Sequence, residues 1–172
     1  MTRMNKIGLV IAGMMILATA ACGSSMATEP YVVEDVFSME YPEGWMYEEE
    51  AGVVGFTADA ESLESMGFVV AYELDLLSES FDIDLSDTEA LLNFYYVSSG
   101  LGAPDIQRES FGGGDWVISD YDYEDGEYSL QGWIAVGRGN EHTLLVVVGS
   151  SPETFADNQA SYDMMFESIE FE

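Results

Sequence analysis

The sequence has very little positive charge. Its 172 residues include four Lys and Arg against 33 Asp and Glu, which gives a formal net charge of −29 at pH 7. Arg3 and Lys6 precede every acid, so residues 22–172 keep two cations and 33 acids, a net charge of −31, and contain no lysine. Such a surface repels phosphates, which excludes nucleic acid as a partner and disfavours direct contact with anionic lipid headgroups.

Cysteine and histidine are nearly absent as well. One Cys and one His exclude an intramolecular disulfide, a Cys-based metal cage and a His-rich metal site. His142 is accompanied by no Gly-x-Ser-x-Gly elbow, so the usual equipment of a serine hydrolase is missing. We therefore expect no enzymatic activity. A hydrolase that uses paired carboxylates stays as an alternative, because 33 acids place many pairs close together by chance.

The N-terminus has the pattern of an export signal. Residues 1–6 carry two positive charges, and residues 7–21 are uncharged and mostly apolar. A basic segment, an apolar segment and small residues before a cleavage site are typical of a secretory signal peptide. The apolar segment is shorter than the roughly 20 residues that a membrane-spanning helix needs.

Ala20, Ala21 and Cys22 end this segment and resemble the lipobox of bacterial lipoproteins. The resemblance implies cleavage after Ala21 and a lipid on Cys22, which would anchor the protein at the extracytoplasmic face of a membrane. The alternative is an uncleaved anchor or an ordinary signal peptide. We expect a signal peptide at 1–21, a lipidated Cys and short tether at 22–33, and a single folded domain at 34–172.

Two helices are expected in this domain. Ser86 and Glu89 form a capping-box pattern before an apolar stretch that ends at Gly100, which predicts a helix at about 87–99. Ser151 and Pro152 open a second helix that carries an apolar stripe to the C-terminus.

The remaining apolar runs are bounded by turn residues and predict strands. They lie at Val36–Tyr41, Trp45–Glu49, Val53–Ala58, Gly67–Leu74, Asp105–Phe111, Asp115–Tyr123, Glu127–Val136 and His142–Gly149. The run Leu144–Val148 is continuous rather than alternating, so we expect it to be central and buried on both faces. Segregated strands and helices indicate an α+β fold with an antiparallel sheet.

Aromatic and turn residues at both ends of the domain resemble a known family. Phe37 and Tyr41 precede the motif Pro42-x-Gly44-Trp45, and the last helix ends in Phe166-x-Ser168-Ile169-x-Phe171. With the meander between them, these motifs resemble the PsbP-like (PsbP/Mog-type) domain over residues 34–172. The resemblance implies an α/β/α sandwich in which helices cover both faces of an antiparallel sheet of about six strands. It also implies a non-enzymatic binding module, since characterised members dock on larger assemblies.

The densest group of acids is a candidate cation site. Asp120, Asp122 and Glu124 alternate with tyrosines and would share one strand face, where three carboxylates can ligate Ca²⁺. The EF-hand pattern does not fit, because Asp125 stands where that loop needs Gly. The other interpretation is a solvated strand face beside a hairpin. The partner is thus an unknown protein or a cation, and Ca²⁺ binding or sensing is the alternative function.

The charge predicts a salt-dependent stability. Because the negative charges repel one another in the folded state and salt screens that repulsion, the melting temperature should rise from low to moderate NaCl concentration. Calorimetry over that range measures the effect. A melting temperature that stays constant or falls would contradict the prediction.

Overall fold

The computed structural model describes residues 26–58, 67–74, 81–125 and 128–172, which form antiparallel sheets and helices. The strands of the larger sheet are β3 (Met46–Glu50), β4 (Val53–Thr57), β5 (Phe68–Ala71), β6 (Gln107–Phe111), β7 (Gly114–Asp125), β8 (Tyr128–Arg138) and β9 (Thr143–Ser150). The smaller sheet consists of β1 (Thr28–Val33), β2 (Phe37–Pro42) and β10 (Glu170–Phe171). The helices are α2 (Thr88–Ser98) and α3 (Pro152–Glu167).

β9 lies at the centre of the larger sheet, whose order is β3–β4–β5–β9–β8–β7–β6. It pairs with β5 on one side and with β8 on the other. Leu144 and Val146 are fully buried on one face of the sheet, and Leu145 is 3% exposed on the other. The expectation of a central strand buried on both faces is confirmed.

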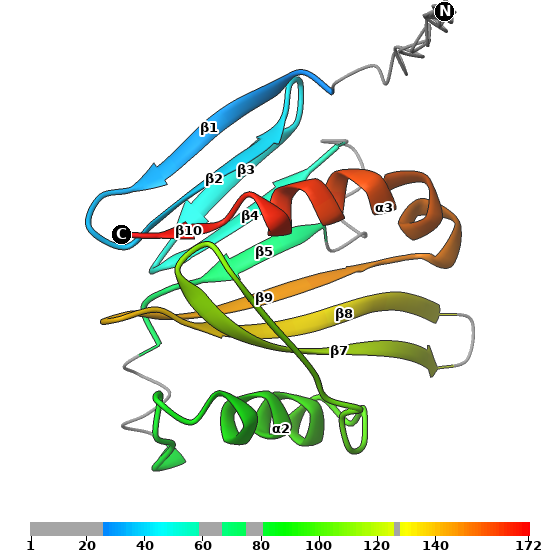
Figure 1. The fold of residues 1–172 in the computed structure, drawn as a ribbon. Coiled ribbons are helices and arrows are strands. Elements are labelled where there is room, and N and C mark those ends of the chain that lie inside the picture. Colours follow the sequence, from blue (N-terminus) through cyan, green and yellow to red (C-terminus); the bar gives the residue numbers. More distant parts are fainter. Residues whose placement is uncertain (1–25, 59–66, 75–80, 126–127) are drawn as a thin grey trace, which may run out of the picture.

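One face of the sheet is covered by α3 together with the smaller sheet (Figure 1). The apolar stripe of α3 packs there, and it consists of Phe155, Tyr162, Met165 and Phe166. Phe37 and Met39 of β2 extend the same core. Two aromatic residues of β4 and β5, Phe56 and Phe68, form the floor beneath them.

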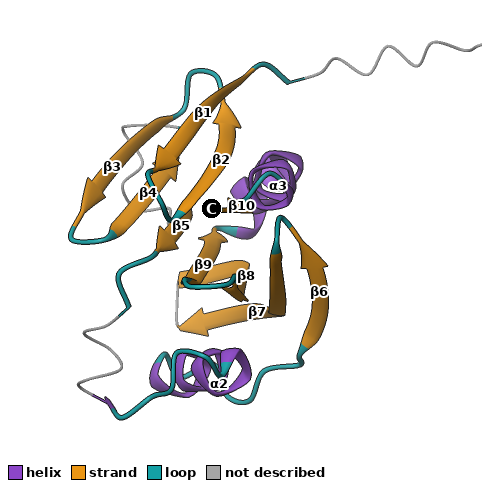
Figure 2. Cartoon of the chain, turned by 60° about the vertical axis from the view of Figure 1, so that its left-hand side comes forward, coloured by secondary structure: helices purple, strands orange, loops and turns teal. Residues whose placement is uncertain are grey.

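The opposite face of β7 and β8 is covered by α2 (Figure 2). Leu91 and Leu92 are fully buried there, against a patch formed by Val117, Ile134, Val136 and Leu145. The Tyr96 hydroxyl shares its single proton between the carbonyl oxygens of Ser119 (2.6 Å) and Asp120 (2.9 Å) in a bifurcated hydrogen bond. This bond attaches α2 to the middle of β7.

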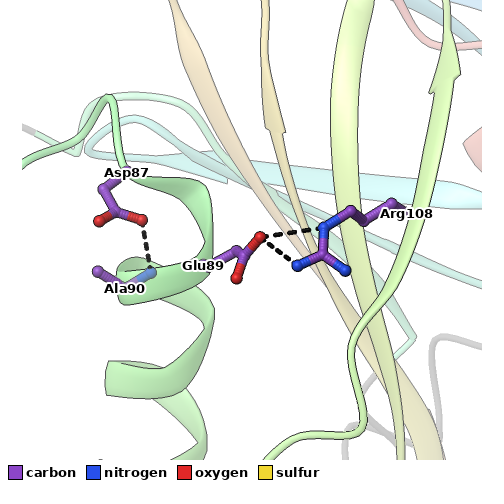
Figure 3. Close-up of polar contacts among 4 residues, drawn as sticks. All are labelled: Asp87, Glu89, Ala90 and Arg108. Carbon is purple, nitrogen blue, oxygen red and sulfur yellow. Dashed lines mark hydrogen bonds and ion pairs between the residues drawn. The ribbon is translucent and has the colours of Figure 1, made fainter.

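The N-terminus of α2 differs from the expected capping box (Figure 3). Asp87 is the N-cap, and its carboxylate accepts a hydrogen bond from the Ala90 amide at 3.0 Å. Ser86 instead donates its hydroxyl to Asp84, and Glu89 pairs with Arg108 across the gap to β6. A carboxylate is a better partner than a hydroxyl for an N-terminal amide because it also stabilises the helix dipole.

The C-terminus of α2 and the N-terminus of α3 are as expected. Gly100 adopts a φ of 75°, which favours glycine, and the amides of Gly100 and Leu101 bond back to the carbonyls of Val97 and Tyr96. Ser151 caps α3, and Pro152 is its first residue. α2 therefore begins and ends within one residue of its predicted limits, and α3 begins where predicted. α3 ends at Glu167 instead of continuing to the C-terminus, because Glu170 and Phe171 pair with β2 as β10.

The sheet is larger than expected, and a second sheet is present. The α+β class and the antiparallel arrangement are confirmed, but the larger sheet has seven strands rather than six. The sandwich expected from the family did not include the smaller sheet, which shares one face with α3. Residues 28–33, assigned to the tether, form β1, because the Tyr31 ring packs against Phe37 and Phe56.

A hydrogen-bonded carboxylate joins the two sheets. Glu49 of β3 accepts hydrogen bonds from the hydroxyls of Tyr31 (2.8 Å) and Tyr72 (2.5 Å). The bonds from Tyr72 and Tyr31 lower the pKa of Glu49. Burial, followed by the contact with Glu49, raises the pKa of Tyr72 to about 12. Both phenols therefore stay protonated and can donate at neutral pH.

Gly137 leaves room for the most enclosed tryptophan. A Cβ at Gly137 would lie 2.5 Å from the Trp116 ring, which is 1% exposed and packs between Phe111 and Phe166. We expect Gly137→Ala to lower the free energy of unfolding by about 1–3 kcal/mol, because the ring has no space to move. Urea unfolding measures the change.

Gly55→Ala is the matched control within β4. Its added Cβ would lie 3.8 Å from the nearest side-chain atom of Val69, an ordinary contact. This variant should be as stable as the wild type or more so. Equal stability of the two variants would contradict the role assigned to Gly137.

Candidate functional site

The predicted acidic residues of β7 border a hollow beside α3. Strand alternation directs the Tyr121 side chain to the α2 face, and it therefore directs Asp120 and Asp122 to the α3 face. The hollow has a volume of about 480 Å³. It is lined by Asp120, Tyr121, Asp122, Gln131, Gly132, Trp133, Phe155, Ala156, Gln159 and Asp163.

A second, smaller hollow of about 190 Å³ adjoins the first. The two share Asp120, Trp133 and Asp163, and the second continues along α3 toward β6. Its other lining residues are Gln107, Glu109, Ile118, Phe166 and Glu167. We call the two hollows together the α3 groove.

The α3 groove is acidic at its rim. Its carboxylates are Glu109, Asp120, Asp122, Asp163 and Glu167, and no Lys, Arg or His lines it. Asp163 and Glu167 are four residues apart on α3 and so lie on one helix face. Partial burial, followed by the nearby charge of Glu167, raises the pKa of Asp163.

The floor of the α3 groove is aromatic. Trp133 is 7% exposed, and its ring centroid lies 4.8 Å from that of Phe166. Phe155 also lines the larger hollow. Carboxylates above aromatic rings suit a positively charged group, because both the carboxylates and the π faces attract a cation.

The structure does not bring the three candidate Ca²⁺ ligands together at one hollow. Glu124 does not line either hollow, whereas Asp120 and Asp122 line the larger one. Alternate residues of a strand are about 7 Å apart, so three of them do not converge on one ion. Among the described residues, no group of three or more Asp, Glu, His or Cys side chains is placed to hold a metal ion.

The arginines and two of the tryptophans of the folded domain lie in different surroundings. Arg108 pairs with Glu89, whereas the Arg138 guanidinium donates to the Thr143 hydroxyl at 2.8 Å. Trp116 and Trp133 are buried in the core. Ala21 and Cys22 lie outside the described residues. No helix in the described ranges is long and apolar enough to cross a membrane.

The contribution of α3 to the groove was not anticipated from the sequence. Asp163 and Glu167 belong to the helix whose apolar stripe was recognised, but they stand beside that stripe rather than on it. Their four-residue spacing was the available signal. It did not indicate which strand they would face.

Comparisons with known proteins identify the fold. The sequence matches no protein-family model and no curated protein. Cyanobacterial PsbP (CyanoP) from Synechocystis sp. PCC 6803 has a similar structure, with a TM-score of 0.55 and 13% identity over 90% of this chain and 99% of that one. LpqN of Mycobacterium tuberculosis, described as involved in cell envelope biogenesis, gives a TM-score of 0.50 and 9% identity over 87% of each chain.

A protein of Bacteroides thetaiotaomicron VPI-5482 gives a TM-score of 0.54 and 14% identity over 86% of this chain. The match covers 49% of that protein, so this chain spans about half of its length. At these identities the similarity concerns the fold. The chain therefore has a PsbP-like fold, as the motifs near Gly44 and Ile169 indicated.

The raised pKa of Asp163 predicts that this carboxylate lowers the free energy of unfolding at neutral pH. A carboxyl with a raised pKa in the folded state stabilises the fold below its unfolded pKa of about 3.9 and loses that contribution as pH rises through the folded value. Asp163→Asn should therefore increase the free energy of unfolding at pH 7, by less than about 1 kcal/mol after solvent screening. It should have little effect near pH 3.

Asp157→Asn is the control, since it removes the same charge from another position of α3 that does not line the groove. Urea unfolding of both variants at the two pH values measures the difference. If Asp163→Asn raises the free energy of unfolding at pH 7 no more than Asp157→Asn does, the surroundings of Asp163 in the groove do not destabilise its charged form.

Proposed function

We propose that this protein is a non-enzymatic binding module that is anchored by a lipid on Cys22 at the extracytoplasmic face of a bacterial membrane. In this proposal it binds a basic segment of a protein partner in the α3 groove. The observation that carries the proposal is the groove itself, a hollow of about 480 Å³ with an aromatic floor and a rim of carboxylates. No catalytic step is assigned to it.

The chemistry of the groove favours a Lys or Arg side chain as the bound group. A guanidinium or ammonium over the Trp133 ring gains a cation–π contact, and Asp120 and Asp163 line the same two hollows as Trp133 and can accept hydrogen bonds from the bound cation. The net negative charge of the chain would also attract a basic partner from a distance and accelerate association.

The rigidity of the groove supports binding without large rearrangement. Asp120 belongs to a strand that is paired with β8 at this position, and Asp163 belongs to a helix whose apolar stripe is buried. Groups held by such elements lose little conformational freedom on binding. A surface of this kind is suited to docking a preformed segment.

The comparisons support the proposed location. LpqN is described as involved in cell envelope biogenesis, and it shares the fold over 87% of its chain. The sequence pattern before Cys22 agrees with an envelope location, because a lipobox directs a protein through the membrane and tethers it there. With the structured domain beginning at Thr28, only residues 23–27 would separate the lipid from β1.

Binding is tested with the full-length, lipidated protein in its own membrane. Gentle solubilisation and affinity purification should recover a defined complex, and chemical cross-links should map to the α3 groove. Asp120→Asn combined with Asp163→Asn should reduce partner recovery about tenfold or more, because two charge-assisted hydrogen bonds are lost. The matched double variant Asp157→Asn with Asp115→Asn removes the same charge elsewhere and should retain the partner.

Recovery of the protein alone, or equal recovery by both double variants, would argue against docking in the groove. The anchor is tested separately by mass spectrometry of the membrane-bound protein. The expected N-terminal residue is Cys22 with a diacylglycerol thioether. A free thiol at Cys22 on a protein that retains residues 1–21 would disprove the anchor without affecting the groove.

A further inference from the structure

An apolar hollow lies on the opposite face of the larger sheet, beside the C-terminal end of α2. Its volume is about 280 Å³. Its lining residues come from α2 and the segment after it and from β7, β8 and β9: Tyr95, Ser99, Leu101, Tyr121, Tyr123, Leu130, Ile134 and Val147. We call it the α2 hollow.

The hollow exists because α2 is shorter than the strands beneath it. Eleven residues of helix span about 16 Å, whereas the twelve residues of β7 extend about 40 Å. Gly100 ends the helix with a φ of 75°, and β7 continues past it to Tyr123. Gly132 pairs with Tyr121 across β7 and β8, and Gly149 of β9 pairs with Gly132. Neither glycine places a side chain beside the Tyr121 ring.

The lining is uncharged, which is unusual in a chain of this composition. None of the eight lining residues is Asp, Glu, Lys, Arg or His. No cation is present there to hold a carboxylate or phosphate, and the net negative charge of the chain repels anions. The chemistry of the α2 hollow thus selects a neutral, largely apolar occupant.

The Tyr121 hydroxyl is left without a partner. Tyr121 is 8% exposed, and its hydroxyl oxygen is buried with no hydrogen-bond partner among the residues that the structure describes. The hydroxyl of the neighbouring Tyr96 makes a bifurcated bond to the backbone, so the contrast is specific to Tyr121. Burial raises the pKa of Tyr121 to about 12, which keeps the phenol protonated and able to donate.

We propose that the α2 hollow binds a neutral, largely apolar small molecule that carries one hydrogen-bond acceptor. This acceptor accepts a hydrogen bond from the Tyr121 hydroxyl. The size follows from the volume, since a cavity of about 150 Å³ holds benzene. A ligand with two fused rings, or with alkyl groups of equal bulk, fits about 280 Å³. A buried polar group without a partner is costly, so an acceptor in the ligand removes that cost on binding.

The test uses two probes that differ only in the acceptor, 2-acetylnaphthalene and 2-ethylnaphthalene. Calorimetry with the wild-type protein should show one molecule of each bound per chain, with the ketone bound about tenfold more tightly. NMR shifts should map to Tyr123, Leu130 and Leu101. Tyr121→Phe should bind both probes with equal affinity.

Three further measurements serve as controls. Tyr47→Phe makes the same chemical change at an exposed position of β3 and should keep the tenfold preference. Tyr121→Phe should be at least as stable as the wild type without ligand, because it removes an unpaired hydroxyl. Leu101→Trp fills the hollow from the segment after α2 and should abolish binding of both probes while the protein stays folded.

The proposal fails if the wild type shows no saturable binding up to the solubility of the ketone, or if the shifts map to the α3 groove. It also fails if Tyr121→Phe keeps the preference for the ketone or is less stable than the wild type, since either result would mean that the hydroxyl has another role. These outcomes leave the proposed docking in the α3 groove unaffected.

Discussion

The fold depends on the burial of β9 on both faces. Leu144, Val146 and Val148 point to one side and Leu145 and Val147 to the other, so the sheet cannot remain open to water on either side. α3 and the smaller sheet cover one face, and α2 covers the other. The position of each helix follows from this requirement: α2 follows β5, α3 follows β9, and each returns to the face that its neighbouring strands leave uncovered.

A chain with two cations after residue 21 needs other partners for its carboxylates, and tyrosine provides several of them. Tyr31 and Tyr72 donate to Glu49, and Tyr41 donates to Glu29 at 2.8 Å. A phenol delivers a hydrogen bond to an ionised acceptor and buries its ring in the same core, which a lysine cannot do as compactly. Within the described ranges, Arg108 with Glu89 is the only ion pair, and both side chains are largely exposed, so it contributes little. Packing and phenol–carboxylate bonds therefore carry the stability that ion pairs supply elsewhere.

The sequence was most informative where a local pattern decides the structure. The meander and the start of α3 were predicted closely, because turn glycines, Pro152 and the apolar periods are local signals. The end of α3 was not, because the pairing of Glu170 and Phe171 with β2 is a tertiary contact. β1 was missed because its structure depends on pairing with β2, which is what buries Tyr31. Pro30 also made a strand less expected, because proline is disfavoured within strands. The cap of α2 was misplaced by one residue since Ser86 and Asp87 are both good N-caps. Of the candidate site, Asp120 and Asp122 were found and Asp163 was not, because only tertiary packing brings α3 over β7.

The two hollows have opposite chemistry because one strand lines both. Along β7, Asp120 and Asp122 point to the α3 face, and Tyr121 and Tyr123 point to the α2 face. The acidic side meets the carboxylates of α3, and the aromatic side meets the uncovered end of α2. A shift of β7 by one residue against β8 would exchange the faces, placing carboxylates in the apolar hollow and phenols in the groove. That shift is opposed by the fully buried Trp116, whose ring fits only above Gly137 in the observed register. The packing of this tryptophan at one end of β7 thus determines which chemistry each surface presents at the other end.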